Sequence, residues 1–221
     1  MSEAKKIATE MAAELRSLPI VNTLTQRAVC RKYSQKISQA APEFVIQLAK
    51  ELLEGYGLRW QAYEMIQGHK AAFKMIGQSE LEMFGQGMDS WSSVDSFART
   101  LSGPAWLNGQ AHDEMFYTWA RSKDRWWRRA ALVSTVALNL RSKGGPGDVP
   151  RTLAVCQVLV NDHDDMVAKA MSWALRELVV HDPQSVSTFL RENETVLAAR
   201  VEREVKNKLR TGLKNPRAAS G

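Results

Sequence analysis

The sequence predicts an all-α fold, a curved stack of antiparallel helix pairs that forms an α-solenoid. Apolar residues recur at the three- and four-residue spacing of amphipathic helices through most of the chain, whereas strand-like alternation is scarce. A pair of the expected helices with its turns takes roughly 35–45 residues, the period of armadillo- or HEAT-type repeats. Self-similarity between successive pairs is weak, so a globular helical bundle is the competing architecture.

Proline, glycine and capping residues bound each periodic run. Pro19 ends the first helix, Thr25 can cap the second, and Pro42 opens the third. Gly103-Pro104 should stop another helix, and the glycine-rich loop 144–147 separates two more. In chain order, the expected helices span residues 3–17, 25–40, 42 to about 54, 58–67, 69–76, 79–86, 91–102, 112–121, 124–142, 150–160, 162–180, 183–191 and 194–213.

The length of 221 residues allows a sizeable core, and we expect one domain over 1–213 with a flexible tail at 214–221. Cys30 and Cys156 lie far apart and lack the spacing of a disulfide framework or a metal site. The start of the chain has no apolar run like that of a secretory signal, and no segment approaches the roughly 20 apolar residues of a membrane span. These features predict a cytoplasmic protein that does not associate with membranes.

Positive charge is concentrated in the second half of the chain. The net charge is +6, yet residues 119–151 alone carry +6 and residues 200–217 carry +5, so the remainder carries −5. Clustered lysine and arginine are typical of nucleic-acid-binding surfaces. The alternative is a pair of ordinary solvated helix faces.

Trp91 and Asp95 are the most informative pair in the sequence. Their four-residue spacing puts both side chains on one face of a helix, one turn apart. A capping box is the structural alternative, with Ser92 as the cap and Asp95 at the third helical position.

The helix around Trp173 has a complete apolar stripe that leaves Trp173 on another face. The stripe consists of Val167, Ala170, Met171, Ala174, Leu175 and Leu178. Lys169, Trp173 and Arg176 share the second face at i, i+4 and i+7. A tryptophan between two cations favours a binding role, although a neighbouring helix could also cover it.

Arg125 and Arg129 share a third candidate face. The planar guanidinium group is suited to binding phosphate, while a plain solvated arginine is the ordinary alternative. The four histidines lack metal-ligand spacing, and the sequence contains no phosphate-binding glycine loop and no Gly-x-Ser-x-Gly elbow. The sequence therefore gives no sign of a metal site.

Three segments resemble, in order and spacing, the HEAT-like DNA alkylation repair glycosylases of the AlkD type. They are Trp91-Ser-Ser-Val-Asp95, Trp119-Ala-Arg-Ser-Lys-Asp-Arg-Trp126-Trp-Arg-Arg129-Ala-Ala131 and Lys169-Ala-Met-Ser-Trp173-Ala-Leu-Arg-Glu177. Each motif is modest alone, but three in register are fairly specific, and the resemblance covers about residues 20–210.

The resemblance implies a curved stack whose concave face binds duplex DNA and which removes purines alkylated at N3 or N7 without a metal or a cofactor. Asp95 would be the catalytic carboxylate, Trp91 and Trp173 the aromatic walls beside the deoxyribose, and Arg129 a contact to the DNA backbone. Lys169, Arg176 and Arg125 are the further candidate DNA contacts. Relatives generally carry a longer N-terminal helical clamp than the single helix expected before Thr23.

The favoured hypothesis is therefore a monofunctional, monomeric glycosylase acting on alkylated duplex DNA. No lysine is placed as a Schiff-base nucleophile, so we expect no lyase step. Two alternatives remain, a HEAT-like DNA-binding protein without catalytic activity and a HEAT-type scaffold for protein interactions.

Overall fold

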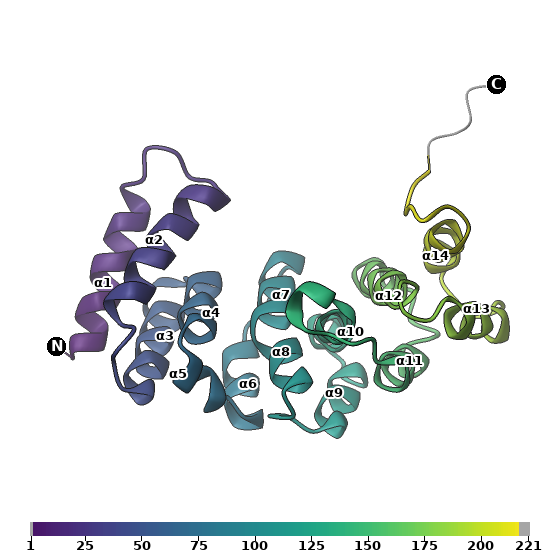
Figure 1. The fold of residues 1–221 in the computed structure, drawn as a ribbon, viewed down its shortest axis with the longest axis horizontal. Helices are drawn as coiled ribbons and strands as arrows, with labels where there is room; N and C mark the ends of the chain where they lie inside the picture. The colour runs from purple at the N-terminus through teal and green to yellow at the C-terminus, as the bar shows by residue number, and fades with distance from the viewer. Residues whose placement is uncertain (1, 217–221) are drawn as a thin grey trace. The chain divides into compact units, whose positions relative to one another are not determined.

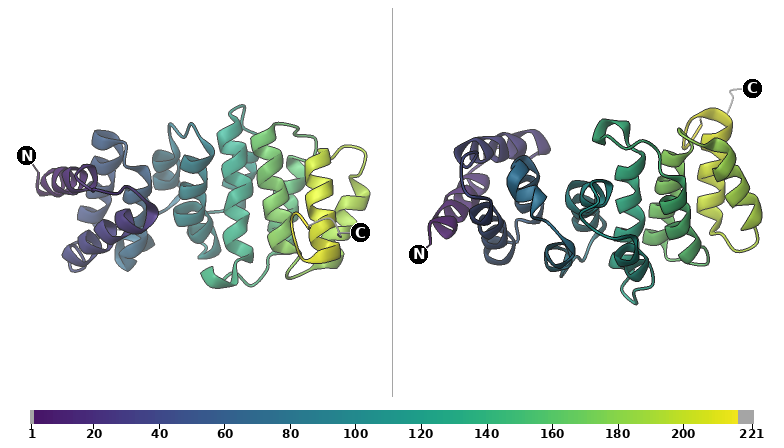
Figure 2. Two further views of the ribbon diagram at one scale, coloured as in Figure 1. Left: turned by 90° about the horizontal axis from the view of Figure 1, so that it is seen from above. Right: turned by 60° about the horizontal axis from the view of Figure 1, so that its bottom comes forward.

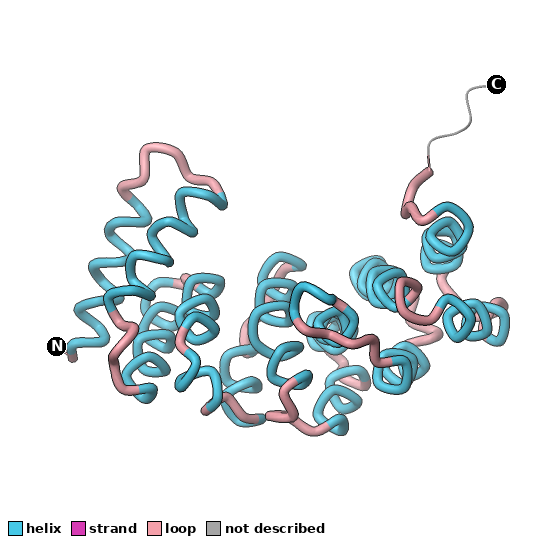
Figure 3. The backbone as a smooth tube through the Cα atoms, in the orientation of Figure 1, coloured by secondary structure: helices cyan, strands magenta, loops and turns pink. Residues whose placement is uncertain are grey.

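The computed structural model describes residues 2–216, and helices connected by short loops account for the fold (Figure 3). Across these residues there is no β-strand, which confirms the predicted all-α class. The helices fall into two compact units, Met1–Gly87 and Met88–Gly221. In each unit, neighbouring helices lie side by side (Figures 1 and 2). The curvature of the stack and the single domain over 1–213 stay predictions, and residues 217–221 of the predicted tail lie outside the described part.

The first unit packs alternate helices against each other. Its helices are α1 (Glu3–Arg16), α2 (Thr23–Lys36), α3 (Pro42–Tyr56), α4 (Arg59–Gly68), α5 (Lys70–Lys74) and α6 (Gln78–Gly85). α1 packs against α3, and α2 packs against α4. The sequence predicted an apolar stripe of Ile7, Met11, Leu15 and Leu18 for the first helix; the first three are buried, whereas Leu18 lies beyond the end of α1 and is half-buried.

The second unit is organised around one buried helix, α10. Its elements are α7 (Trp91–Phe97), the π-helical turn η1 (Ala98–Ser102), α8 (Gly103–Leu107), α9 (Asp113–Ala120), α10 (Arg125–Asn139), η2 (Arg141–Lys143), α11 (Val149–Val158), α12 (Asp165–Leu178), α13 (Pro183–Glu192) and α14 (Ala199–Thr211). Every residue of α10 from Arg129 to Asn139 is buried, and the helix packs against α7, α8, α9, α11 and α12. α12 also packs against α14. No helix in residues 2–216 combines the length and apolar character that crossing a membrane requires.

Three helix starts differ from the prediction by more than one residue. The last helix, expected from residue 194, begins at Ala199. α2 is capped by Asn22 rather than Thr25, because the extended backbone of Asn22 lets its side chain accept the Thr25 N–H at 3.0 Å while the Thr25 hydroxyl accepts the Asn22 N–H at 3.2 Å. α12 is capped by Asp164 rather than Asp162, which instead forms an ion pair with Arg128 at 2.7 Å.

The prediction that Gly103-Pro104 stops a helix is wrong. The Gly103 N–H donates to the Ala98 carbonyl, five residues back, so a wide π turn leads directly into α8. Pro104 has no N–H to continue the regular pattern, and the wider turn accommodates it. A Cβ on Gly103 would lie 2.7 Å from the Ala137 Cβ. The glycine therefore permits close packing against α10 and does not act as a terminator.

Candidate functional site

The centre of the candidate site is a two-pronged ion pair between α7 and α10. Arg129 donates from Nε to Asp95 Oδ1 and from Nη2 to Asp95 Oδ2, both at 2.9 Å. The Arg129 side chain is 6% exposed and the Asp95 side chain 18%. A bidentate pair of this kind fixes the plane as well as the position of the carboxylate.

Arg129 also connects the pair to a third helix. Its Nη1 donates to the backbone carbonyl of Met166, in the first turn of α12. One buried guanidinium therefore joins α7, α10 and α12, and the Asp95 carboxylate is oriented by all three. The sequence had singled out both Asp95 and Arg129 but not their contact.

The capping alternative for Asp95 does not hold. Ser90, not Ser92, caps α7, where its hydroxyl accepts the Ser93 N–H at 3.3 Å and the Ser93 hydroxyl accepts the Ser90 N–H at 3.1 Å. Asp95 is thus the fifth helical residue rather than the third. Its two carboxylate oxygens are bound by Arg129 and do not serve the start of the helix.

Trp91 is the first residue of α7 and is one of the most exposed large apolar residues in residues 2–216, at 58%. Packing does not account for an exposed indole of this size. Trp91 and Asp95 stand one helical turn apart in α7, the spacing that the sequence predicted.

Trp173 is held by two neighbours on the half-buried side of α12. Its Nε1 donates to Glu177 Oε1 at 3.0 Å, and the Arg99 guanidinium lies 5.5 Å from the centre of its ring. The predicted apolar stripe of α12 is entirely buried, and Trp173 lies off that stripe. Arg99 and Glu177 are the neighbours of Trp173 that the sequence reasoning missed. The four-residue spacing of Asp95 and Arg99 is the signal that could have found Arg99.

Two of the other predicted DNA contacts, Lys169 and Arg125, already interact with neighbouring side chains. Lys169 forms an ion pair with Asp165 at 2.6 Å, which lowers the pKa of that carboxyl. The Arg125 guanidinium lies 5.2 Å from the Trp126 ring centre and 3.3 Å from Oδ2 of Asp164, the residue that caps α12.

Arg176 is less available than the sequence suggested. Its Nε donates to Ser172 Oγ at 3.2 Å, and burial lowers its pKa even though Glu204 and Glu177 act in the other direction. The guanidinium is thus drawn towards the α12–α14 interface.

Chemically, this arrangement can stabilise a positive charge and position a water molecule. A carboxylate offers about four lone-pair directions, of which Arg129 uses two. The remaining ones, on a carboxylate that keeps some solvent access, are available to a ligand or to water. A tryptophan stands on the same helix, and a second is presented by α12.

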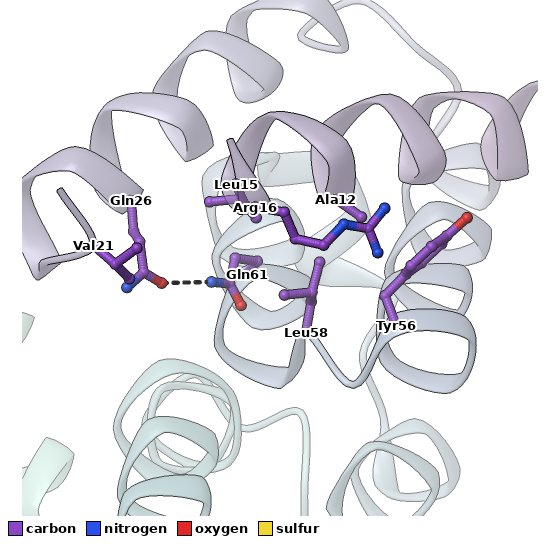
Figure 4. A pocket seen from close by; sticks show the side chains of 8 residues that line it. All are labelled: Ala12, Leu15, Arg16, Val21, Gln26, Tyr56, Leu58 and Gln61. Carbon is purple, nitrogen blue, oxygen red and sulfur yellow. Dashed lines mark hydrogen bonds between the residues drawn. The ribbon is translucent and has the colours of Figure 1, made fainter. Parts of the chain in front are cut away.

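Metal-binding clusters and pockets are the other features of the described residues that bear on ligand binding. Across the described residues, no group of three or more His, Cys, Asp or Glu side chains could hold a metal ion. A pocket of about 320 Å³ lies in the first unit, where Gln61 donates to Gln26 at 2.9 Å (Figure 4). Its lining of Ala12, Leu15, Arg16, Val21, Gln26, Tyr56, Leu58 and Gln61 contains no carboxylate and is mostly apolar.

The chain matches the family described as DNA alkylation repair enzyme. The match covers residues 2–209, nearly the whole chain. No curated protein matches the chain.

Proposed function

The chain belongs to the DNA alkylation repair enzyme family, and from that premise we propose that it is a monofunctional DNA glycosylase. Its substrate would be duplex DNA carrying purines alkylated at N3 or N7, and its reaction the hydrolysis of the bond between base and sugar. The observation that carries the proposal is the Asp95 carboxylate, fixed by the two-pronged pair with buried Arg129.

A purine alkylated at N3 or N7 is already cationic and leaves readily. As its bond to C1′ breaks, the electron pair goes to the purine nitrogen, the base departs neutral, and positive charge grows on the sugar. Water then adds its oxygen to C1′ and releases a proton. In the proposed mechanism Asp95 stabilises the sugar cation and orients the water through the lone pairs that Arg129 leaves free. Charge fixed in advance at the reacting atom is usually the largest contribution to catalysis.

The two indoles would flank the deoxyribose. An aromatic face attracts a cation, by about 0.5–1 kcal/mol when exposed and about 2 kcal/mol when water is excluded. Trp173 is suited to this role because Glu177 and Arg99 fix its orientation. Trp91, exposed at the start of α7, would complete the enclosure when DNA binds.

The cations Lys169, Arg125 and Arg176 are the proposed contacts to phosphate. The positive charge on residues 119–151 supports the assignment of Arg125, because neutralising phosphates dominates non-specific DNA affinity. Arg129 fits a different role from the backbone contact expected for it, since its N–H groups are directed at Asp95 and Met166. We propose that it positions Asp95.

A second function has one observation in its favour. Because Asp95 is already paired with Arg129, the pair could serve only to join α7 to α10. The protein would then bind alkylated duplex DNA without releasing the base.

The test is base release from a duplex containing a single N7-methylguanine, measured as free base by chromatography. Asp95→Asn keeps the size of the side chain and removes its charge, and Asp89→Asn makes the same change at an exposed residue just before α7. We expect release by the parent and by Asp89→Asn but not by Asp95→Asn, which should still bind the duplex. Equal release by Asp95→Asn would refute the catalytic role, and binding without release by the parent would establish the second function.

A further inference from the structure

The aromatic arrangement around Trp173 occurs a second time, in the first unit. On α4, Trp60 Nε1 donates to Glu64 Oε1 at 3.2 Å, just as Trp173 Nε1 donates to Glu177 on α12 at 3.0 Å. In both cases the acceptor lies four residues after the tryptophan, so it holds the indole against its own helix.

An arginine from another helical segment also lies over each of these indole rings. The Arg27 guanidinium, on α2, lies 5.9 Å from the Trp60 ring centre, and that of Arg99 lies 5.5 Å from the Trp173 ring centre. Tryptophan is the strongest aromatic partner for a cation. A guanidinium held in this way loses less conformational freedom when its N–H groups bind an anion.

The register between α2 and α4 is fixed on both sides of this contact. Gln61 donates to Gln26 at 2.9 Å, immediately beside Trp60 and Arg27. Further along α4, a Cβ on Gly68 would lie 3.3 Å from Ser34 Oγ, so the two helices stay close there as well. The surface formed by Arg27, Arg31, Trp60 and Glu64, which we call the Trp60 patch, therefore has a defined geometry.

The cations of α2 divide into two groups. Lys32 and Lys36 form ion pairs with Glu14 and Glu10 of α1 at 2.7 and 2.8 Å. Arg27 and Arg31 are exposed, and within residues 2–216 neither forms an ion pair.

The charges of the Trp60 patch also act on the buried thiol of Cys30. Burial is the main reason that the pKa of Cys30 is raised to about 12; Glu64 acts in the same direction, and the charges of Arg27 and Arg31 act against it. With two cations and one carboxylate, the patch carries a net positive charge.

The Trp60 patch lacks a counterpart of Asp95. Its one carboxylate, Glu64, accepts the indole N–H. The patch therefore offers two cations that can bind anions and an aromatic ring that can pack against an apolar surface. The sugar-phosphate backbone of a nucleic acid presents both kinds of group.

We propose that the Trp60 patch is a second contact to the backbone of duplex DNA. Arg27 and Arg31 bind phosphates, and Trp60 holds Arg27 and packs against a sugar. The inference rests on the proposed function insofar as the ligand is DNA. It assigns binding without hydrolysis to this patch, and it predicts that affinity comes from the first unit as well as from the Asp95 site.

The first test is the salt dependence of binding to a short undamaged duplex. Arg27→Ala/Arg31→Ala removes two phosphate contacts and should reduce the slope of log K against log salt by about 1.8. Arg27→Lys/Arg31→Lys should keep most of the slope. Lys32→Ala/Lys36→Ala, which removes the same charge from the same helix, should leave the slope unchanged. An unchanged slope in the arginine double variant, or equal changes in both alanine double variants, would overturn the proposal.

The second test looks for a gain of affinity, which misfolding cannot produce. Glu64→Gln keeps an acceptor for the indole N–H and removes a negative charge, so it should tighten duplex binding about threefold. Glu54→Gln, an exposed change on α3, should have no effect. No gain at Glu64, or the same gain at both positions, would contradict the proposal. Both tests measure DNA binding and do not depend on base release. If the parent released no base, the glycosylase proposal would be refuted, but the two binding tests would still decide whether the Trp60 patch contacts DNA.

Discussion

Replacing Arg129 with methionine tests whether the pair with Asp95 holds the site together. The methionine fills much of the space of the arginine stem but removes three hydrogen bonds, two to Asp95 and one to the Met166 carbonyl. Asp95 is then left partly buried with no counter-charge. Both stability and base release should fall.

The magnitude follows from the burial of the pair. Breaking a buried ion pair by removing one partner costs about 3–5 kcal/mol. Asp95 keeps 18% exposure, so water offsets part of this cost and about 2–4 kcal/mol is expected. In a chain of this size, 1 kcal/mol corresponds to about 2–4 °C, so the thermal midpoint should fall by about 4–16 °C.

The assay combines thermal unfolding with base release. Arg125→Met, one turn earlier on α10 and in a more exposed pair, should cost at most about 1 kcal/mol. The double variant Asp95→Asn/Arg129→Met should be less destabilised than the sum of its single changes, because no uncompensated charge remains. Arg129→Lys should recover part of the stability but little of the rate, since an ammonium cannot make the two-pronged contact. A midpoint for Arg129→Met equal to that of the parent, or full activity in Arg129→Lys, would refute the reasoning.

Two further predictions concern the frame of the second unit. Gly103→Ala places a Cβ 2.7 Å from that of Ala137 and should lower the free energy of unfolding by about 1–3 kcal/mol. Gly55→Ala, with open space around the new Cβ, should be neutral or stabilising. Equal thermal midpoints for the two variants would contradict this prediction. Burial alone would raise the pKa of Glu204, but a hydrogen bond from Ser172 and two nearby cations lower it overall. The ionised carboxylate therefore stabilises the fold at neutral pH, and this contribution is lost as the pH falls through the lowered pKa. The difference in midpoint between the parent and Glu204→Gln should therefore shrink from pH 7 to about pH 3, and a constant difference would count against the assignment.

The helices were predictable because their signals are local. The apolar stripe of α12 was read correctly from the sequence, and every member of it is buried. Helix starts were less certain because several residues of the same chemistry stand side by side. Ser90, Ser92 and Ser93 can all cap a helix, and the choice depends on which backbone is extended, here that of Ser90.

Gly103-Pro104 was misread for a different reason. The pair is a common stop signal, but its role here depends on a neighbour 34 residues away. Gly103 is required by the approach of Ala137 on α10, which is a tertiary contact that no local pattern contains.

The candidate site was predictable residue by residue but not as an arrangement. Trp91, Asp95, Arg129 and Trp173 were all singled out. The direction of the Arg129 side chain was not, because a solvated arginine and a buried one look the same in a helical pattern. The contact joins residues 34 apart, and only packing of α7 against α10 brings them together.

The position of Arg129 bears on how the proposed chemistry would work. Its guanidinium lies on the most buried helix of the unit and fixes the carboxylate of α7 against α12. The carboxylate is therefore held by the buried core, while Trp91 at the start of α7 is exposed. In the proposed reaction positive charge develops at one sugar atom, and a carboxylate fixed in advance at that atom is what such a reaction needs.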